Sequence, residues 1–591
     1  MNAMDTVLGV GRSVTGRRWV WRSAEERIGL GIAQRMGLPE MVGRLLAARG
    51  VGIEAAADFL DPRLRSFLPD PSVLADMDRA AERLARAVER RETVAVFGDY
   101  DVDGACAGAL LVSLLGRLGC PVLAHVPHRL REGYGPNEPA LAGLVGRGAS
   151  LIVCVDCGAA AGELLVRMLE RADVVVLDHH KMEAPPPAAI PVVNPNRLDD
   201  GSGLGGLCAA AVAFMAAVAL VRRLRAAGFF TGREEPDLLG YLDLVALASV
   251  CDVMPLSGLN RALVTQGLKV MARLERPGIA ALAEVTQLRE APSAFTCGYV
   301  FGPRINAAGR ISEADLGLRL LLAEDAAEAR ALAARLDAVN RERQQVEAAI
   351  LDVALAKAAL QAESGHPALL VSGAEWHPGV VGIIAGRIKE KFNRPTCVAA
   401  IAGDRATGSG RSVPGVDLGA AVIAARQTGI LLSGGGHAMA AGFALAAADL
   451  PRFHALLDER LAAAGALPRA ADLAVEGTLE VAGATVDLAR QLRRLAPFGA
   501  GNEEPMLVLA RARIVRADRI GREATTVRVF LEAEGGGPRL KALLFRARDG
   551  ILAETMLDRA QVPLHVAGHL RAEAWNGVES PGFVIADAAP A

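Results

Sequence analysis

Residues 93–104 read TVAVFGDYDVDG, a short apolar run that leads directly into a cluster of carboxylates. Two later segments have the same form: LIVCVDCG at 151–158 and VVVLDHH at 174–180. Between the first two runs, residues 104–118 have the pattern of a helix. Short apolar strands that alternate with helices are typical of βαβ units. The sequence therefore predicts an α/β domain built on a parallel sheet.

Polar side chains follow each of the three predicted strands at the point where the strand ends. They are Asp99, Asp101 and Asp103 after the first, Asp156 after the second, and Asp178, His179 and His180 after the third. Because the carboxyl ends of parallel strands meet at one edge of a sheet, where α/β proteins place their ligand sites, we expect these groups to lie together. An Asp in this position is often only a helix N-cap, and Asp103 is open to that interpretation.

The mixture of donor atoms indicates which metal such a cluster would bind. Oxygen ligands favour Mg²⁺ or Mn²⁺, and a histidine nitrogen moves the preference towards Mn²⁺. Two ions about 3.5–4 Å apart would hold the attacking and leaving oxygens of a phosphoryl centre. The sequence contains no GxxxxGK[ST] loop, which disfavours a nucleoside triphosphatase motor, and no GxSxG elbow. We therefore predict phosphoester hydrolysis with Mn²⁺ (or Mg²⁺), as a pair of ions.

The composition is that of a globular protein. The 591 residues allow about three or four domains, and a hydrophobic content of 52% excludes a disordered chain. The net charge is −2, so a polyanionic partner must be attracted by local groups rather than by an overall field. The eight cysteines lack a disulfide-dense spacing and no signal sequence is recognisable, which favours the cytoplasm. The longest apolar stretch, 209–221, is shorter than the ~20 residues of a membrane span, so no membrane contact is expected.

Changes of pattern along the chain suggest five parts. Residues 314–361 are rich in Ala, Leu, Glu and Arg and predict a long helix that connects two domains. After residue 472, short alternating strands separated by Gly, Pro or Asp predict a small all-β barrel. The expected parts are an N-terminal region (1–85), a parallel-sheet catalytic domain (86–325), a connecting helix (326–361), a second α/β domain (362–467) and the barrel (468–591).

Several motifs together resemble the signature of the DHH phosphoesterase family. They are DYDVDG at 99–104, Asp156, DHH at 178–180 and Asp252, with GGGHAMAAGF at 434–443 resembling the DHHA1 domain that accompanies them. The resemblance extends over nearly the whole chain. It implies a DHH domain joined by the long helix to a DHHA1 domain, followed by an OB-fold that holds a single strand of nucleic acid.

The resemblance also implies roles for individual residues. The implied metal ligands are Asp99, Asp101, Asp156, His179 and Asp252. His180 would lie near the scissile phosphate as a catalytic group, with Asp103 and Asp178 in support. Asp178 would orient a histidine through its ring N–H, as the partners of metal-bound imidazoles usually do.

The exonuclease members of this family cut single-stranded DNA from its 5′ end. The resemblance implies that reaction here, with 5′-mononucleotides as the product, a role in recombination and repair, and single-strand-binding protein and a helicase as partners. Arginine- and glycine-rich loops suit a pocket for the terminal 5′-phosphate, because guanidinium groups, hydroxyls and accessible backbone amides bind phosphate oxygens. The candidate substrate-binding residues are Arg304, Arg310, Ser409, Arg411, Ser412, Gly435, Gly436 and His437.

Two other functions stay open at this point. One is a phosphoesterase of the same family that acts on small substrates, such as an oligoribonuclease or a nucleotide phosphatase. Those enzymes generally lack the barrel and the N-terminal region, so the length of this chain argues against them. The other is a DNA-binding scaffold without catalysis, whose hallmark would be missing metal ligands. Every ligand position is filled in this sequence.

Overall fold

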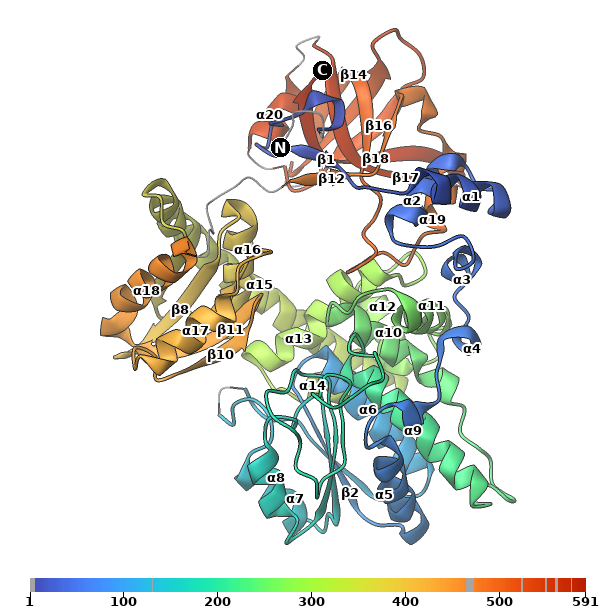
Figure 1. Ribbon diagram of the computed structural model, residues 1–591, viewed down its shortest axis with the longest axis vertical. Helices are drawn as coiled ribbons and strands as arrows, with labels where there is room; N and C mark the ends of the chain where they lie inside the picture. The colour runs from blue at the N-terminus through green and yellow to red at the C-terminus, as the bar shows by residue number, and fades with distance from the viewer. Residues whose placement is uncertain are drawn as a thin grey trace. The chain divides into compact units, whose positions relative to one another are not determined.

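Two compact units make up the chain in the computed structural model (Figure 1). The structure describes residues 6–129, 131–463, 472–521, 524–547, 550–558, 562–575 and 577–591. The first unit contains Met1–Ile305, Asp315–Ala333 and Asp472–Ala591, and the second contains Asn306–Ala314 and Ala334–Ala471. Among the described helices, none combines the length and the apolar character that crossing a membrane requires.

A five-stranded parallel sheet forms the centre of the first unit. Its strands are β2 (Val94–Gly98), β3 (Val122–His125), β4 (Leu151–Val155), β5 (Asp173–Leu177) and β6 (Val192–Val193). They lie in the order β3-β2-β4-β5-β6, and every neighbouring pair is parallel. The α/β class and the parallel sheet predicted from the apolar runs are confirmed.

Helices cover both faces of this sheet, which explains why its strands are apolar throughout rather than alternating. One face packs against α7 (Glu138–Gly146) and α8 (Gly162–Met168). The strand residues on that face alternate along each strand: Ala95, Phe97, Ile152, Cys154, Val174 and Val176. Elsewhere the sheet contacts α6 (Val102–Arg117) and α9 (Ala209–Ala226), which also pack on each other.

Further helices complete the first unit. The N-terminal region contributes α1 (Glu26–Met36), α2 (Glu40–Ala48), α3 (Ala56–Leu60), α4 (Leu64–Phe67) and α5 (Met77–Arg90). The part that follows the sheet contributes α10 (Leu242–Cys251), α11 (Gly258–Met271), α12 (Pro277–Val285), the π-helix η5 (Thr296–Phe301) and α14 (Leu316–Leu322). Helix α10 contacts α6, α9 and α11, so it is held close to the sheet by its helical neighbours.

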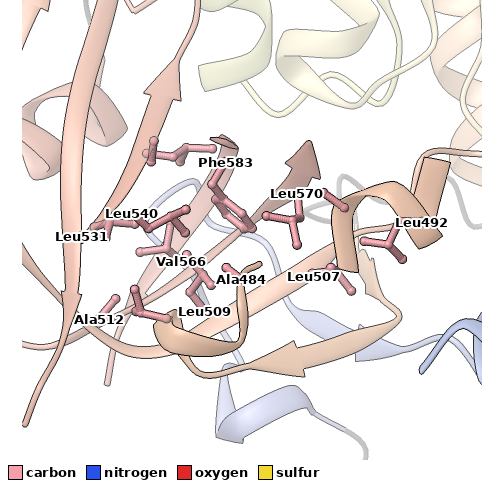
Figure 2. Packing of buried hydrophobic residues seen from close by; sticks show 14 of the residues in the cluster. Ala484, Leu492, Leu507, Leu509, Ala512, Leu531, Leu540, Val566, Leu570 and Phe583 are labelled. Atoms are coloured by element: carbon pink, nitrogen blue, oxygen red, sulfur yellow. The ribbon is translucent and has the colours of Figure 1, made fainter. Parts of the chain in front are cut away.

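The C-terminal part of the first unit is a ring of antiparallel and parallel strands. They are β14 (Leu507–Ile520), β15 (Thr526–Ala533), β16 (Leu540–Leu544), β17 (Leu564–Trp575) and β18 (Val578–Pro590). Because β14 pairs with both β15 and β17, the order β14-β15-β16-β18-β17 closes on itself. Figure 2 shows its core, where Leu531, Val566 and Phe583 point toward one another.

The N-terminal segment packs on this C-terminal ring. Strand β1 (Trp19–Trp21) pairs in parallel with β12 (Leu473–Val475), and β13 (Gly477–Leu479) then joins β14. The buried indole of Trp19 donates a hydrogen bond to the carboxylate of Asp587, 3.0 Å away. This part of the chain also contains the α-helices α19 (Val486–Arg493) and α20 (Ile551–Leu557).

The second unit is built on a five-stranded mixed sheet. Its strands are β7 (Leu369–Ala374), β8 (Thr396–Ala402), β9 (Arg405–Arg411), β10 (Ser433–His437) and β11 (Ala440–Ala446), in the order β10-β11-β9-β8-β7. Only β7 and β8 are parallel to each other. Its helices are α16 (Val381–Phe392), α17 (Leu418–Gln427) and α18 (Leu450–Ala463). Helices α13 (Gly302–Ile311) and α15 (Ala326–Glu363) belong partly to each unit.

Two segments differ in local structure from the loops expected from the sequence. Arg304 and Arg310 lie in helix α13, because RINAAGR contains helix-forming residues and only one glycine. The glycines of SGGGH lie in strand β10, which forms a hairpin with β11. Because β10 is the edge strand of its sheet, this pairing uses the backbone hydrogen-bonding groups on one side of the glycine run.

Candidate metal centre

The three strands that carry the acidic motifs end at the same level of the sheet. Gly98, the last residue of β2, is paired with Val155 at the end of β4, and Val155 is paired with Leu177 at the end of β5. The residues that follow these three positions therefore emerge side by side at one edge. The sequence predicted that the polar residues after these strands would lie together at one edge of a parallel sheet, and they do.

The turn after β2 is shaped by Asp101 and Gly104. The Asp101 carboxylate caps helix α6, accepting hydrogen bonds from the backbone amides of Asp103 at 2.9 Å and Gly104 at 3.2 Å. A Cβ atom on Gly104 would lie 2.4 Å from the carbonyl oxygen of Asp99, so only glycine allows the first turn of α6 to approach this close. The DxDG spacing thus folds Asp99 and Asp101 back beside each other.

Asp103 lies in the first turn of α6, but its side chain supports a different helix. Its side chain is 1% exposed, and its two oxygens accept hydrogen bonds from the amides of Ala209, at 2.6 Å, and Ala210, at 2.8 Å. These are the first residues of α9. Asp103 therefore caps α9, the kind of structural role that the sequence left open for it, while its Oδ2 also lies 3.6 Å from the ring of His179.

His179 stands at the centre of the carboxylates. Its Nε2 lies 3.3 Å from an oxygen of Asp156 and 3.4 Å from an oxygen of Asp252. Asp156 follows β4 in the left-handed backbone region, with φ at 58°, which Asp tolerates better than most residues. Asp252 comes from outside the sheet, as the residue that ends helix α10. The packing of α10 against α6 and α9 brings this carboxylate to the strand ends.

His180 lies at the outer side of the cluster and is oriented by Asp178. Its Nδ1 is 2.8 Å from Asp178 Oδ1, and its side chain is 47% exposed. Asp178 itself is buried and accepts hydrogen bonds from the amides of His180 at 3.1 Å and Ala159 at 3.0 Å. Burial alone would lower the pKa of His180, but the hydrogen bond and charge of Asp178 raise it to about 9. Burial alone would raise the pKa of Asp178, but His180 keeps that pKa below its usual value.

Three groups at this edge were not predicted from the sequence. The hydroxyl of Tyr134 lies 3.3 Å from Nδ1 and 3.2 Å from Nε2 of His180. Asn194 donates to the carbonyl of His180 at 2.8 Å, and Asn196 donates to the carbonyl of His179 at 2.7 Å. All three residues lie outside the helices and strands, where no periodic pattern marks them. An asparagine pair after a short strand is the only local signal, and it also suits an ordinary turn.

Several buried carboxylate oxygens at this edge have no hydrogen-bond partner among the described residues. They are Asp99 Oδ1, Asp156 Oδ1 and Asp252 Oδ2. Burial, together with the neighbouring carboxylates, raises the pKa of Asp99 and Asp156 well above their usual value, and raises the pKa of Asp252 to about 8. Like charges held together away from water are unfavourable unless a cation compensates them. This donor set therefore fits a divalent metal. We use the name metal centre for the residues that offer ligand atoms at this edge: Asp99, Asp101, Asp103, Asp156, His179, His180 and Asp252.

The ligand atoms of the metal centre fall into three overlapping groups. In each group the ligand atoms lie within 4.8 Å of one another: Asp99, Asp101 and Asp156; Asp156, His179 and His180; and Asp103, His179 and Asp252. Asp156 and His179 are each shared by two groups. A carboxylate can bridge two neighbouring ions through its two oxygens, so the shared position of Asp156 is compatible with a pair of ions, whereas the ring nitrogen of His179 can bind only one of them.

In the second unit, three of the predicted phosphate-binding residues gather at the start of helix α16. Arg310 donates to the carbonyl of Gly379 at 3.1 Å, two residues before α16 begins. At Gly382, in the first turn, a Cβ atom would lie 3.1 Å from the hydroxyl of Ser409 and 3.2 Å from a guanidinium nitrogen of Arg411. A helix N-terminus with two arginines and a hydroxyl beside it suits a phosphate group.

The other predicted phosphate-binding residues are placed differently. Ser412 is 1% exposed, and its hydroxyl donates to the carbonyl of Val416 at 2.7 Å, so this group is used within the fold. Gly435, Gly436 and His437 lie at the end of β10, where Gly436 and His437 are exposed. Arg304 belongs to the first unit, and its guanidinium donates to the carbonyl of Val300 at 2.7 Å.

Comparison with protein families identifies each part of the chain. Residues 93–249 match the model of the DHH family N-terminal domain, residues 365–463 match the DHHA1 domain, and residues 475–587 match the RecJ OB domain. The resemblance drawn from the motifs is therefore confirmed.

Individual relatives match over most of their length. The single-stranded-DNA-specific exonuclease RecJ of Escherichia coli (strain K12) is 37% identical over 543 residues, which cover 89% of this chain and 92% of the relative. RecJ of Bacillus subtilis (strain 168) is 32% identical over 97% of this chain and 71% of the relative. The crystal structure of RecJ from Thermus thermophilus in complex with Mn²⁺ has a TM-score of 0.78 and 31% identity, and covers 95% of this chain and 78% of that one. The chain belongs to the family of the single-stranded-DNA-specific exonuclease RecJ.

Proposed function

We propose that the protein is a metal-dependent exonuclease that removes 5′-mononucleotides from the 5′ end of single-stranded DNA. The observation that carries this proposal is the set of buried carboxylate oxygens around His179 that have no hydrogen-bond partner among the described residues, in a chain that is 37% identical to a single-stranded-DNA-specific exonuclease. The similar structure from T. thermophilus is a complex with Mn²⁺, and a second one contains Mg²⁺. Mn²⁺ or Mg²⁺, as a pair of ions, is the cofactor that we assign.

The chain's own residues then take distinct roles. Asp99, Asp101, Asp156, His179 and Asp252 hold the metal, and bound metal supplies Lewis acidity and an activated water. Asp178 fixes the ring of His180, and the exposed imidazolium of His180 faces the place where the scissile phosphate binds. With its pKa raised to about 9, His180 carries a proton at neutral pH. It therefore offers a charged hydrogen bond to a phosphate oxygen. Asp103 keeps α9 in position beneath this edge.

The direction of digestion rests on the second unit. Arg310, Ser409 and Arg411 lie at the N-terminus of α16, where backbone amides and guanidinium groups suit a terminal phosphate. Recognition of a 5′-phosphate would fix the polarity as 5′→3′. Ser412 is better assigned to the fold than to the substrate, because its hydroxyl is used by Val416. Arg304, Gly435, Gly436 and His437 remain candidates for contacts along the strand.

The cellular context is proposed from the family. Recombination and repair generate single-stranded ends, which a helicase would supply and single-strand-binding protein would coat. The C-terminal part, residues 475–587, matches the RecJ OB domain and is proposed to bind the single strand. All eight cysteines are free thiols, as a reducing compartment would keep them, so we retain the cytoplasm as the proposed location. For the domain boundaries we retain 1–85, 86–325, 326–361, 362–467 and 468–591.

The test is digestion of single-stranded DNA labelled separately at each end. Reactions contain Mn²⁺, Mg²⁺ or chelator, and duplex DNA and short oligoribonucleotides are run in parallel. We expect metal-dependent release of mononucleotides from the 5′ label only. Rapid cleavage of dinucleotides without cleavage of DNA would assign a small-substrate phosphoesterase instead, and binding without any cleavage would assign a scaffold.

Arg411 tests the polarity separately. We expect Arg411→Ala to remove the preference for 5′-phosphorylated over 5′-hydroxyl ends, since its guanidinium lies with Ser409 beside the first turn of α16. Ser412→Ala is the matched control, because the Ser412 hydroxyl is buried and bonded to Val416. Equal loss of activity on both kinds of end would mean that Arg411 binds the strand in general and does not read its terminus.

A further inference from the structure

Two stacked aromatic rings stand exposed in the first unit. Phe295 is 63% exposed and Tyr299 is 68% exposed. Their ring centroids are 4.9 Å apart and their planes differ by 26°, so the rings lie nearly parallel. Aromatic side chains supply much of the apolar area of a protein core, and a contiguous exposed pair usually marks a surface that binds another molecule.

The pair belongs to the element that packs beside the metal centre. Phe295 directly precedes the π-helix η5, and Tyr299 lies within it. The thiol of Cys251, next to the candidate ligand Asp252, donates to the carbonyl of Cys297 at 3.3 Å. The rings are thus carried by a helical turn that contacts the end of α10, which holds Asp252. π-Helical turns are rare and frequently occur at functional sites.

A positive charge lies close to the same turn. Arg304 donates from its guanidinium to the carbonyl of Val300, at 2.7 Å, and Val300 directly follows Tyr299. Arg304 is only partly buried. Flat aromatic faces beside a guanidinium match the two parts of a nucleotide, because bases stack on rings while phosphates pair with cations.

We propose that Phe295 and Tyr299 form a stacking platform for one nucleobase of the strand that is cut at the metal centre. This inference rests on the proposed function, since it takes single-stranded DNA as the substrate. Every base has a π-face, so such a platform holds the strand without reading its sequence. In a duplex those faces are covered by neighbouring bases. The platform therefore also favours single strands over duplexes.

The first arm of the test measures binding in the presence of chelator, so that the strand stays intact. The probe is a 5′-phosphorylated oligonucleotide with 2-aminopurine moved one position at a time. We expect fluorescence quenching at one position in the wild-type protein and its loss in Phe295→Ala and Tyr299→Ala, with Kd raised about tenfold or more. Tyr299→Phe should retain both the quenching and the affinity, whereas Tyr299→Leu, which is apolar without a flat face, should not. Leu239→Ala is the matched control, because Leu239 is 53% exposed in the same unit.

The second arm measures digestion in Mn²⁺ with an abasic nucleotide moved along the strand. In the wild type, one abasic position should raise KM while kcat stays nearly constant. In Tyr299→Ala that position should lose its effect, because the base then has no platform. The platform is overturned if Phe295→Ala and Tyr299→Ala both keep the wild-type KM, the wild-type Kd and the wild-type dependence of KM on the position of the abasic nucleotide. A wild-type protein that quenches 2-aminopurine at one position but does not digest DNA would instead overturn the proposed function and leave the platform standing.

Discussion

The chain contains a second cluster of acid and imidazole, and it differs from the metal centre in how its oxygens are used. In the second unit, ligand atoms of His366, His454 and Asp458 also lie within 4.8 Å of one another. Both oxygens of Asp458 are engaged, one 2.5 Å from Nδ1 of His366 and the other accepting from the amide of Ala368 at 3.2 Å. The metal centre instead has three buried carboxylate oxygens without a hydrogen-bond partner among the described residues.

The comparison shows that residue types alone do not identify a metal site. The rings of His366 and His454 stack with centroids 4.6 Å apart, and His454 Nε2 is 3.0 Å from the carbonyl of Ala368. This cluster therefore joins α18 to the start of β7. At the metal centre, the buried carboxylates outnumber the two imidazole groups beside them, so their charge favours binding of a further cation. Unpaired buried charge, rather than the presence of Asp and His, distinguishes a binding site from a structural contact.

Neutralising one residue in each cluster gives the largest expected contrast. We expect Asp156→Asn to lower turnover on single-stranded DNA by about a thousandfold or more, since a metal ion contributes several kcal/mol to the transition state. Asp458→Asn should leave turnover per folded molecule unchanged. The measurement is kcat on a 5′-phosphorylated oligonucleotide in Mn²⁺, with circular dichroism to establish folding. Near-normal turnover in a folded Asp156→Asn protein would remove the distinction between the clusters.

Stabilisation by metal should separate the same two variants. A protein that binds Mn²⁺ only in its folded state is stabilised by about 2.7 kcal/mol when the Mn²⁺ concentration is about a hundred times the Kd. We expect a rise in Tm of the wild type and of Asp458→Asn, and little or none for Asp156→Asn, which loses a shared ligand. A Tm shift in wild type that disappears in Asp458→Asn would place the bound metal in the second unit.

Without metal, the second cluster should matter more for stability than the first. Asp458→Asn removes the charged partner of His366 and should lower the free energy of unfolding by about 0.5–1 kcal/mol, because the two side chains are 37% and 21% exposed and water screens the pair. Urea denaturation in chelator measures this. Asp156→Asn relieves repulsion among buried carboxylates, so it should be neutral or stabilising under the same conditions. Destabilisation by Asp156→Asn as large as that by Asp458→Asn would contradict this expectation.

The pH dependence of metal affinity sharpens the comparison further. Burial and the neighbouring carboxylates raise the pKa of Asp252 to about 8 in the metal-free protein. Below that pH the carboxyl group carries a proton that the metal must displace. We expect Mn²⁺ affinity to rise about tenfold per pH unit for each proton released, and the contribution of Asp252 to this rise to end above about pH 8. Calorimetry in buffers of different ionisation enthalpy measures the number of protons released when Mn²⁺ binds. If Asp252→Asn releases as many protons as the wild type, the protons come from another group.

The sequence allowed the sheet and its acidic edge to be predicted, because both depend on local patterns. Each apolar run is a strand buried on both faces, and a parallel sheet brings the ends of its strands together. The first unit thus follows from residues close to one another in sequence. The metal assignment from the donor set is supported by the Mn²⁺ and Mg²⁺ complexes of similar structures.

Contacts between distant residues could not be predicted in this way. Asp103 caps α9, more than 100 residues later, and no local signal connects it with Ala209 and Ala210. Tyr134 reaches His180 from a segment outside the helices and strands. The glycines of SGGGH also misled, because a run of glycine is equally compatible with a loop and with a strand that pairs through its backbone.

The pairing of β1 with β12 bears on how the chain is made. Arg18 and Asp472, which lie beside this pair and bond to each other, are 454 residues apart in sequence. A ribosome that adds about 5–20 residues per second needs roughly 20–90 s to cover that distance. Until then the aromatic side chains of Trp19 and Trp21 emerge without the strand that they accompany in the finished protein. Chaperones that shield nascent aromatic segments should therefore matter for the segment around Trp19 and Trp21, which is made long before it can reach its final place.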